Sequence, residues 1–290
     1  MADSKRILIT GSSSGFGFGA AKALAARGHR VFASMRGAAG KNAAQADALR
    51  SWAKTEGKTL EVLELDVTDE DSVGRAVAAM VAQVGGVDTL INNAGVGTWG
   101  PQEAFTPEQV QRMFDVNVFG VLRLNRAVLP HMRAAGRGHL IYVSSGLGRI
   151  QLPFIGPYTA SKHAIEALAE TASYELAPLG IDTSILQPGA YGTSFLANSL
   201  PPADSARVEA QPKIKAMFEA FGSGFEAKAK AGELGNPEEI VDALVALVEA
   251  AAGQRPLRQT VGDDVKEGVG AINATCAQVQ ARLLSAFGLR

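Results

Sequence analysis

The sequence predicts an α/β domain built on a doubly wound parallel sheet with helices on both faces. Short runs rich in Val, Ile and Leu alternate with longer segments of helical periodicity over the first two-thirds of the chain. These runs show little polar alternation, which is typical of strands buried on both faces. No linker-like change of composition and no internal repeat divides the 290 residues. A single domain over residues 1–290 is therefore the better count.

The apolar runs and the residues that flank them predict the order of the elements. Strands are expected at residues 6–10, 30–34, 60–65, 89–92, 139–144 and 182–186, with a last strand near 258–261. Crossover helices are expected between strands, for example at 16–27, 42–54 and 69–84. Thr106-Pro107-Glu108-Gln109 is a start signal for a further helix, and Asn236-Pro237-Glu238-Glu239 repeats it before a helix at 240–252.

Composition and charge narrow the classes of function. The chain has 28 Lys and Arg against 29 Asp and Glu, so there is no positive excess to bind a nucleic-acid backbone. No apolar run is long enough for a signal peptide or a membrane span, which predicts a cytoplasmic protein without a membrane partner. The one cysteine, Cys276, stands in an apolar stretch and is expected to be buried. The four histidines lack metal-ligand spacing, so no metal is expected.

A glycine-rich loop follows the first expected strand and opens into an alanine-rich helix. Small residues let a backbone turn tightly, and a helix N-terminus offers free N–H groups to a pyrophosphate. The spacing is Gly-x-x-x-Gly-x-Gly, which is neither the commonest dinucleotide pattern nor a P-loop. Glycines of an ordinary strand–helix turn are the alternative. The candidate cofactor-binding residues are Gly11, Ser13, Ser14, Gly15, Phe16 and Gly17.

A tyrosine and a lysine stand four residues apart at an expected helix start. Gly156-Pro157 precedes Tyr158, and the spacing puts Tyr158 and Lys162 on one helical face. A neighbouring ammonium lowers the pKa of a phenol, and a tyrosine tuned in this way can exchange a proton with an alcohol or carbonyl oxygen. Ser145 follows the fifth expected strand and offers a hydroxyl to polarise a substrate carbonyl, with Ser144 as the competing candidate.

The ordered motifs resemble the short-chain dehydrogenase/reductase family over about residues 5–193. Besides the glycine loop, Ser145, Tyr158 and Lys162, the resemblance rests on Asn93, Ala94 and Gly95, on Asn117 in Asp-Val-Asn-Val, and on Pro188, Gly189 and Thr193. It implies a Rossmann-like fold and hydride transfer, with Tyr158 as acid/base and Lys162 lowering its pKa and binding the nicotinamide ribose. It also implies that Ser145 orients the substrate oxygen, that Asn117 maintains a proton relay, and that the protein is a homodimer or homotetramer.

The second expected strand indicates which dinucleotide is bound. An acidic residue at its end would bond the ribose 2′-hydroxyl and repel a 2′-phosphate, and none stands between Arg30 and Gly40. Arg36 offers a planar donor fork suited to phosphate, and Lys41 could assist. NADP(H) is therefore preferred over NAD(H), although a solvated arginine is the alternative. Asp66 and Val67 resemble the pair that contacts adenine in the family.

The segment at residues 189–235 is expected to be a helical substrate flap. Its apolar residues are Phe195, Leu196, Ile214, Met217, Phe218, Phe221 and Phe225, and those from Ile214 onward form one helical stripe. Trp99, Leu152, Phe154 and Tyr191 add apolar surface near the expected site. A lipophilic ketone, aldehyde or secondary alcohol is the expected substrate, and a resemblance to hydroxysteroid and retinol dehydrogenases agrees. Most such stripes are core, so packing is the default interpretation of this one, and lining of an apolar substrate pocket is the alternative.

Three other functions compete with that of an NADP-dependent oxidoreductase. The first is an NAD-linked alcohol dehydrogenase. The second is a protein of the same fold that senses dinucleotides without turnover, which would be expected to lose the tyrosine or the lysine. The third, an epimerase or dehydratase, normally has a larger substrate domain. Because Asn117, Ser145, Tyr158 and Lys162 are all present, the sequence favours an enzyme.

Overall fold

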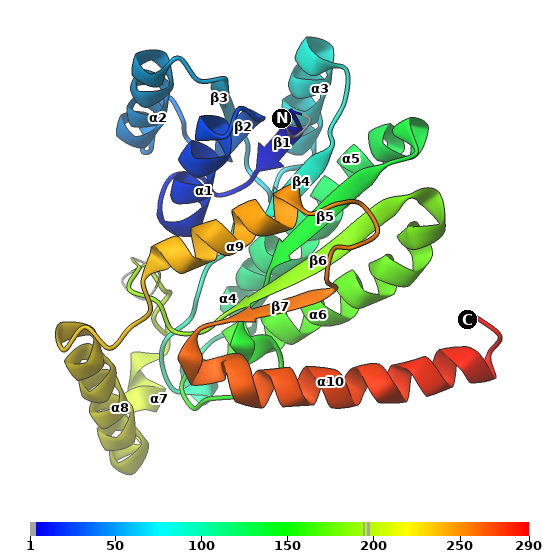
Figure 1. The fold of residues 1–290 in the computed structure, drawn as a ribbon. Helices are drawn as coiled ribbons and strands as arrows, with labels where there is room; N and C mark the ends of the chain where they lie inside the picture. Colours follow the sequence, from blue (N-terminus) through cyan, green and yellow to red (C-terminus); the bar gives the residue numbers. More distant parts are fainter. Residues whose placement is uncertain (1–3, 194, 196–197, 290) are drawn as a thin grey trace.

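A parallel sheet forms the centre of the protein in a computed structural model that describes residues 4–193, 195 and 198–289 (Figure 1). Within these residues the sheet has seven strands in the order β3-β2-β1-β4-β5-β6-β7. The strands are β1 Arg6–Ile9, β2 Arg30–Met35, β3 Leu60–Glu64, β4 Thr89–Asn92, β5 Gly138–Val143, β6 Ile181–Pro188 and β7 Arg258–Val261. The order reverses between β1 and β4, so the doubly wound, Rossmann-like sheet is confirmed.

Helices cover both faces of the sheet because its strands are apolar on both sides. One layer contains α1 Gly15–Ala26, α2 Ala43–Glu56 and α9 Pro237–Glu249. The other contains α3 Glu70–Val84, α5 Gly120–Ala135 and α6 Gly156–Leu176. The predicted strands and helices are all present, and their ends differ by a few residues, as helix and strand ends commonly do.

Of the two predicted helix-start signals, one forms a complete capping box and the other forms only part of one. At α4 Pro107–Phe114, the Thr106 hydroxyl accepts from the Gln109 N–H while the Gln109 side chain accepts from the Thr106 N–H, a complete capping box. At α9 the Asn236 side chain accepts from the Glu238 N–H. The Glu239 carboxylate instead accepts a hydrogen bond from the Tyr191 hydroxyl, so it takes part in a tertiary contact.

The segment at residues 189–235 extends from one end of the sheet and carries two helices. These are α7 Ser205–Glu209 and α8 Pro212–Lys230, which lies at the lower left of Figure 1. None of the 19 residues of α8 is buried. The predicted stripe is wrong at Met217, which is 57% exposed. Leu196 lies outside the described residues.

The last helix, α10 Asp263–Ala286, runs along the edge of the protein toward the C-terminus (Figure 1). Val265 and Val269 near its start are buried, whereas Val279 and Leu283 near its end are half exposed. The expectation of a buried Cys276 is wrong, because this thiol lies on the exposed part of α10. No helix in the described part of the chain is long and apolar enough to cross a membrane.

Candidate active site

The glycine loop connects β1 to α1, and its positions require glycine for two different physical reasons. A Cβ on Gly11 would lie 2.8 Å from Ala94 Cα, and one on Gly17 would lie 2.5 Å from Asn93 Nδ2. These two glycines therefore let the loop pack against the chain after β4. Gly15 has a φ of +54° and faces open space, because a Cβ there would have no neighbour within 4 Å. The side chain of Ser14 at the N-cap makes no cap hydrogen bond, so the start of α1 stays open to an anion.

Residues after β4 hold this loop in place. The Thr10 hydroxyl accepts from the Asn93 and Ala94 N–H groups at 3.1 and 3.0 Å. Asn93 Nδ2 donates to the carbonyls of Thr10 and Gly11 at 2.8 and 3.1 Å. The predicted Asn93, Ala94 and Gly95 motif thus lies beside the loop. A tight turn with open space at Gly15 and an uncapped helix start fits the pyrophosphate of a dinucleotide.

The predicted catalytic side chains meet at the carboxyl end of β5. Tyr158 and Lys162 lie on the first two turns of α6, and Lys162 Nζ is 5.6 Å from the centre of the Tyr158 ring. Lys162 Nζ also donates to the Val143 carbonyl at 2.8 Å. The Tyr158 hydroxyl forms a hydrogen bond with Ser145. Ser144 is excluded from this pairing by its place: its hydroxyl is buried without a partner and lies toward Gly148.

Burial controls the ionisation of both groups. It raises the pKa of the Tyr158 hydroxyl well above its ordinary value, and the hydrogen bond with Ser145 opposes this. Burial also lowers the pKa of the Lys162 ammonium to about 8, against the opposing attraction of the Glu166 carboxylate. In the protein alone, the phenol form of Tyr158 is therefore favoured. This differs from the expectation that Lys162 dominates the pKa of Tyr158.

Asn117 lies where α4 passes into α5 through a π-helical turn, Asp115–Phe119. Such turns widen a helix locally and are frequent at functional sites. The Asn117 side chain accepts from the Val96 N–H at 2.8 Å and donates to the Val96 carbonyl at 2.9 Å. It also donates to the Ser161 hydroxyl at 3.0 Å. Asn117 thus connects the chain after β4 to α6, which it contacts at Ser161, between Tyr158 and Lys162 in the sequence.

Arg36 follows β2 and is exposed at the same edge of the sheet as the glycine loop. Burial acts to raise the pKa of Asp66, but two hydrogen bonds from Thr68 and, after them, the charges of Arg36 and Lys41 hold this pKa below its usual value. Val67 is buried beside Gly120 and belongs to the core. Arg36, Lys41 and Asp66 are therefore near one another.

One residue of this edge was missed by the sequence analysis. The Glu64 carboxylate accepts from the N–H groups of Gly37 and Ala38, both at 2.6 Å, and so holds the turn that follows Arg36. Glu64 ends β3 and pairs in register with Met35 at the end of β2. Because parallel strands end at the same edge, the predicted order of strands could have indicated this carboxylate.

Pro188 ends β6, and Gly189 and Thr193 follow it. The Pro188 carbonyl accepts a long hydrogen bond of 3.5 Å from the Ser145 hydroxyl. A Cβ on Gly189 would collide with the Asp264 carboxylate. Tyr191 was expected on the substrate side, and this expectation is wrong. Its ring packs edge-on against Phe16 in the layer of α1 and α9.

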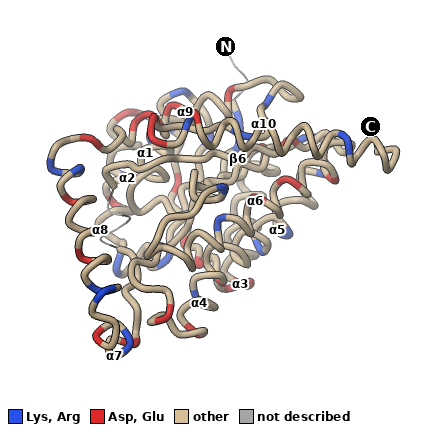
Figure 2. The backbone as a smooth tube through the Cα atoms, turned by 90° about the horizontal axis from the view of Figure 1, so that it is seen from below, with Lys and Arg blue, Asp and Glu red and all other residues tan. Residues whose placement is uncertain are grey.

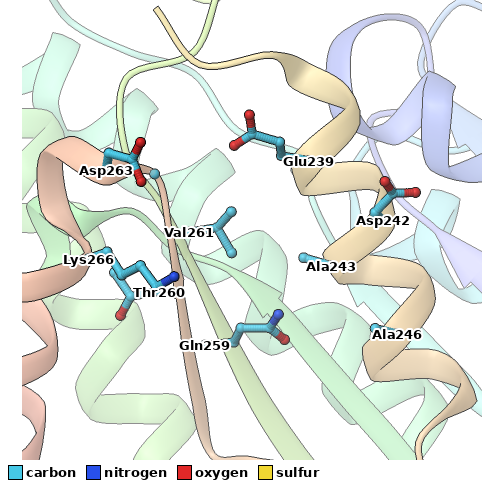
Figure 3. Close-up of a pocket in the computed structure, with 10 residues that line it drawn as sticks. Glu239, Asp242, Ala243, Ala246, Gln259, Thr260, Val261, Asp263 and Lys266 are labelled. Atoms are coloured by element: carbon cyan, nitrogen blue, oxygen red, sulfur yellow. The ribbon is translucent and has the colours of Figure 1, made fainter.

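A hollow of about 560 Å³ lies between α9 and the start of α10 (Figure 3). Glu239 and Asp242 on α9 line one side, and Lys266 on α10 lines the other. Neither Tyr158 nor Lys162 lines it. The chemistry at the end of β5 therefore identifies the site better than the size of a hollow does.

Aromatic rings gather near Tyr158, whose own ring contacts Phe195 at 5.1 Å. Trp99 stacks on Phe221 at 5.3 Å and contacts Phe218 and Phe225 at 6.0 and 6.2 Å. Phe154, whose φ of +66° is unusual for an aromatic residue, contacts Phe218 at 5.3 Å. Leu152 is 46% exposed beside these rings in sequence. Three of the predicted stripe residues thus attach α8 to the loops that follow β4 and β5.

The chain is similar to known proteins over most of its length. A family model described as short chain dehydrogenase matches residues 5–203. The chain belongs to this family. It is 35% identical over 273 residues to an uncharacterized oxidoreductase of Bacillus subtilis, covering 90% of each chain. It is 32% identical to retinol dehydrogenase 8 of Homo sapiens over 88% of this chain and 80% of the relative.

Further relatives and solved structures of the short-chain dehydrogenase family are similar to this chain. The chain is 34% identical to 17-beta-hydroxysteroid dehydrogenase type 1 of Mus musculus, over 84% of this chain and 70% of the relative. A short-chain dehydrogenase from Streptomyces avermitilis has a TM-score of 0.75 and 29% identity, covering 99% of this chain and 100% of that one. A gluconate 5-dehydrogenase from Burkholderia cenocepacia, in complex with NADP and tartrate, has a TM-score of 0.73 and 28% identity over 92% and 96%. The chain is thus an oxidoreductase that acts on alcohol or carbonyl groups.

Proposed function

We propose that the protein is an NADP(H)-dependent oxidoreductase that transfers a hydride between the nicotinamide and a lipophilic ketone, aldehyde or secondary alcohol. The observation that carries this proposal is the buried Tyr158 hydroxyl, bonded to Ser145 and beside Lys162, at the carboxyl end of β5. That place lies next to the glycine loop, at the reversal of strand order where ligands of doubly wound sheets bind.

The nicotinamide, when bound, supplies or accepts the hydride, and the chain's own residues manage the proton. In carbonyl reduction, Tyr158 gives its hydroxyl proton to the developing alkoxide, while the Ser145 hydroxyl donates a hydrogen bond to the same oxygen. One N–H of the Lys162 ammonium donates a hydrogen bond to the Val143 carbonyl, and the other two are left to bind the nicotinamide ribose. Asn117 keeps Lys162 connected to a proton relay by holding the chain at Val96 and Ser161. In alcohol oxidation the same proton moves back to Tyr158.

The dinucleotide would be held by the loop and the strand ends described above. The glycine loop, with Ser13, Ser14 and Phe16, would hold the pyrophosphate, Asp66 and the backbone at Val67 would lie beside the adenine, and Asn93 to Gly95 and Pro188 to Thr193 would flank the nicotinamide. Arg36 supports NADP(H) over NAD(H), because its exposed guanidinium suits a 2′-phosphate and no acidic side chain follows β2 directly. The similar Burkholderia enzyme binds NADP, which agrees with this preference.

The surroundings of Tyr158 support an apolar substrate. Met113, Ile155 and Tyr158 form a small core cluster against which Trp99 and Leu147 pack. The segment at 189–235 would act as the substrate flap, since α8 brings a row of phenylalanines to Trp99. Two relatives are named for retinol and for a hydroxysteroid, both lipophilic alcohols. The net charge of −1 and the mixed charges of Figure 2 give no support to an anionic polymer as substrate.

We also propose a homodimer or homotetramer in the cytoplasm. The exposed apolar side chains near the end of the chain, Val279, Leu283, Phe287 and Leu289, support association of subunits. Light scattering on the purified protein measures the state directly.

Replacing Tyr158 by Phe tests the proposed function. The variant should bind NADPH as the wild type does, and its turnover should fall by about 10²–10⁴, because it lacks the general acid. Tyr142→Phe is the matched control, since it removes a buried hydroxyl on β5 that accepts a hydrogen bond from Asn125 of α5 and lies in the core. Full activity of Tyr158→Phe, or equal losses in both variants, would overturn the assignment.

A further inference from the structure

A buried carboxylate that the proposed chemistry does not use lies one helical turn beyond Lys162. Glu166 is four residues further along α6, on the same face as Lys162, and only 2% of it is exposed. A buried carboxylate is unfavourable unless it is paired and hydrogen-bonded. Its position beside the catalytic lysine therefore calls for an explanation in terms of its partners.

Side chains of β6 and β7 bind the Glu166 carboxylate. Its Oε2 accepts from Arg258 Nε of β7 at 2.9 Å, and its Oε1 accepts from Gln187 Nε2 of β6 at 2.8 Å. Arg258 is itself nearly buried, with 8% of its side chain exposed, and its Nη2 donates to Glu170 at 2.6 Å. The side-chain oxygen of Gln187 accepts from Thr260 and Asn273, so Gln187 presents its amide to Glu166. This network holds the carboxylate in one place.

Glu166 also supports the turn that carries Ser145. The 3-10 turn Gly146–Gly148 follows Ser145, whose hydroxyl accepts from the Leu147 N–H at 3.1 Å. A Cβ on Gly148 would lie 2.9 Å from Glu166 Cγ and 2.8 Å from the Ser144 hydroxyl. The turn therefore packs directly on the Glu166 side chain. Glu166 thus contacts the turn that follows Ser145 and lies on the same face of α6 as Lys162.

The charges around Lys162 are few. Its Nζ is buried between the Val143 carbonyl and the Tyr158 ring, and Glu166 is the carboxylate that attracts it. Beyond Glu166 lie the cation Arg258 on β7 and the carboxylate Glu170, which pairs with Arg258 and is also attracted by Arg149. Burial works against the Lys162 ammonium, and Glu166 works for it.

We propose that Glu166 is a positioning residue of the active site, which keeps Lys162 in its ammonium form and supports the turn that presents Ser145. The inference rests on the proposed function, because it assigns Glu166 a role through Lys162 and Ser145. Glu166 itself touches neither substrate nor cofactor in this role. Arg258 and Gln187 extend the role to β6 and β7, which hold the carboxylate.

The pH profile of carbonyl reduction tests this role. The pKa of Lys162 lies at about 8, so the ammonium is lost above that pH in the wild type. In Glu166→Gln the attraction is removed while burial stays, so the alkaline limb of kcat should move to lower pH by roughly one unit or more. Glu170→Gln is the matched control, because it removes a carboxylate from the same helix and the same Arg258 but not from the neighbourhood of Lys162. Its limb should stay at the wild-type pH.

The limbs of the wild type and the two variants decide the proposal. A shifted limb in Glu166→Gln with an unshifted limb in Glu170→Gln supports it, and equal limbs in all three proteins overturn it. Should Glu166→Gln not fold, the double variant Glu166→Gln/Arg258→Met removes both charges of the buried pair, and its limb should move in the same direction by a smaller amount, because the repulsion from Arg258 is removed as well. Lys162→Met separates the two proposals: full activity there refutes the function proposed for Lys162, whereas an inactive Lys162→Met with an unshifted Glu166→Gln refutes the role of Glu166 alone.

Discussion

Individual residues at this site are governed first by burial and then by their neighbours. Tyr158 and Lys162 were predicted from spacing alone, and both lie together on α6. Their ionisation could not be predicted in the same way, because burial raises the pKa of Tyr158 and lowers that of Lys162, and the spacing of residues contains no information on burial. Glu64 and Glu166 were missed for a related reason, since both act through contacts between elements.

Arg36 gives the sharpest test of cofactor preference. Replacing Arg36 by Ala removes the exposed guanidinium after β2, so NADPH should bind about ten times more weakly or worse, in keeping with a charge-assisted contact of about 1.5–3 kcal/mol. NADH binding should change little, because it has no 2′-phosphate. Fluorescence titration of both cofactors measures the two affinities.

The control for that titration is Arg30→Ala. Arg30 is an exposed arginine at the opposite end of the same strand, so it changes the net charge equally but lies far from the carboxyl edge. It should leave both affinities unchanged. Tighter binding of NADH than of NADPH by the wild type would contradict the preference, and the NAD-linked alternative would then replace it.

Whole elements were predicted well where one strong periodicity identifies them. The buried strands and the start of α4 follow from apolar runs and from a capping box that forms completely. The faces of the later elements were harder to predict, because a stripe of apolar residues does not reveal which part of it meets the body. Met217 is therefore exposed and Tyr191 faces α1, although both were placed on the substrate side.

The helix α8 is attached to the body through aromatic rings. Replacing Trp99 by Ala removes three ring contacts, each worth about 0.5–1.5 kcal/mol, so amide exchange in residues 212–230 should become at least about tenfold faster. The KM for lipophilic substrates should rise while NADPH affinity stays the same. Met217→Ala, an exposed change on the same helix, serves as the control and should alter neither quantity. Unchanged exchange in Trp99→Ala would show that other contacts hold α8.

At the scale of the whole molecule, the sequence predicts the doubly wound sheet and the place of the site, and it fails at the periphery. The strand order brings the glycine loop, the segment after β4 and the end of β5 to one edge, where they meet as predicted. Cys276 was predicted to be buried and is exposed, which shows where prediction from an apolar stretch fails. The 24 residues of α10 span about 36 Å at 1.5 Å per residue, and none of them after Val269 is buried, so an apolar stretch becomes exposed.

Transfer of deuterium tests the central claim, that this protein moves a hydride to a carbonyl carbon. NADPH that carries deuterium at the transferable position of its dihydronicotinamide is incubated with the protein and a panel of lipophilic ketones and aldehydes. We expect alcohols with deuterium on the former carbonyl carbon, as measured by mass spectrometry, and none from Tyr158→Phe above the trace level of that variant. Tight NADPH binding with no alcohol from any member of the panel, or alcohol without deuterium, would contradict the claim.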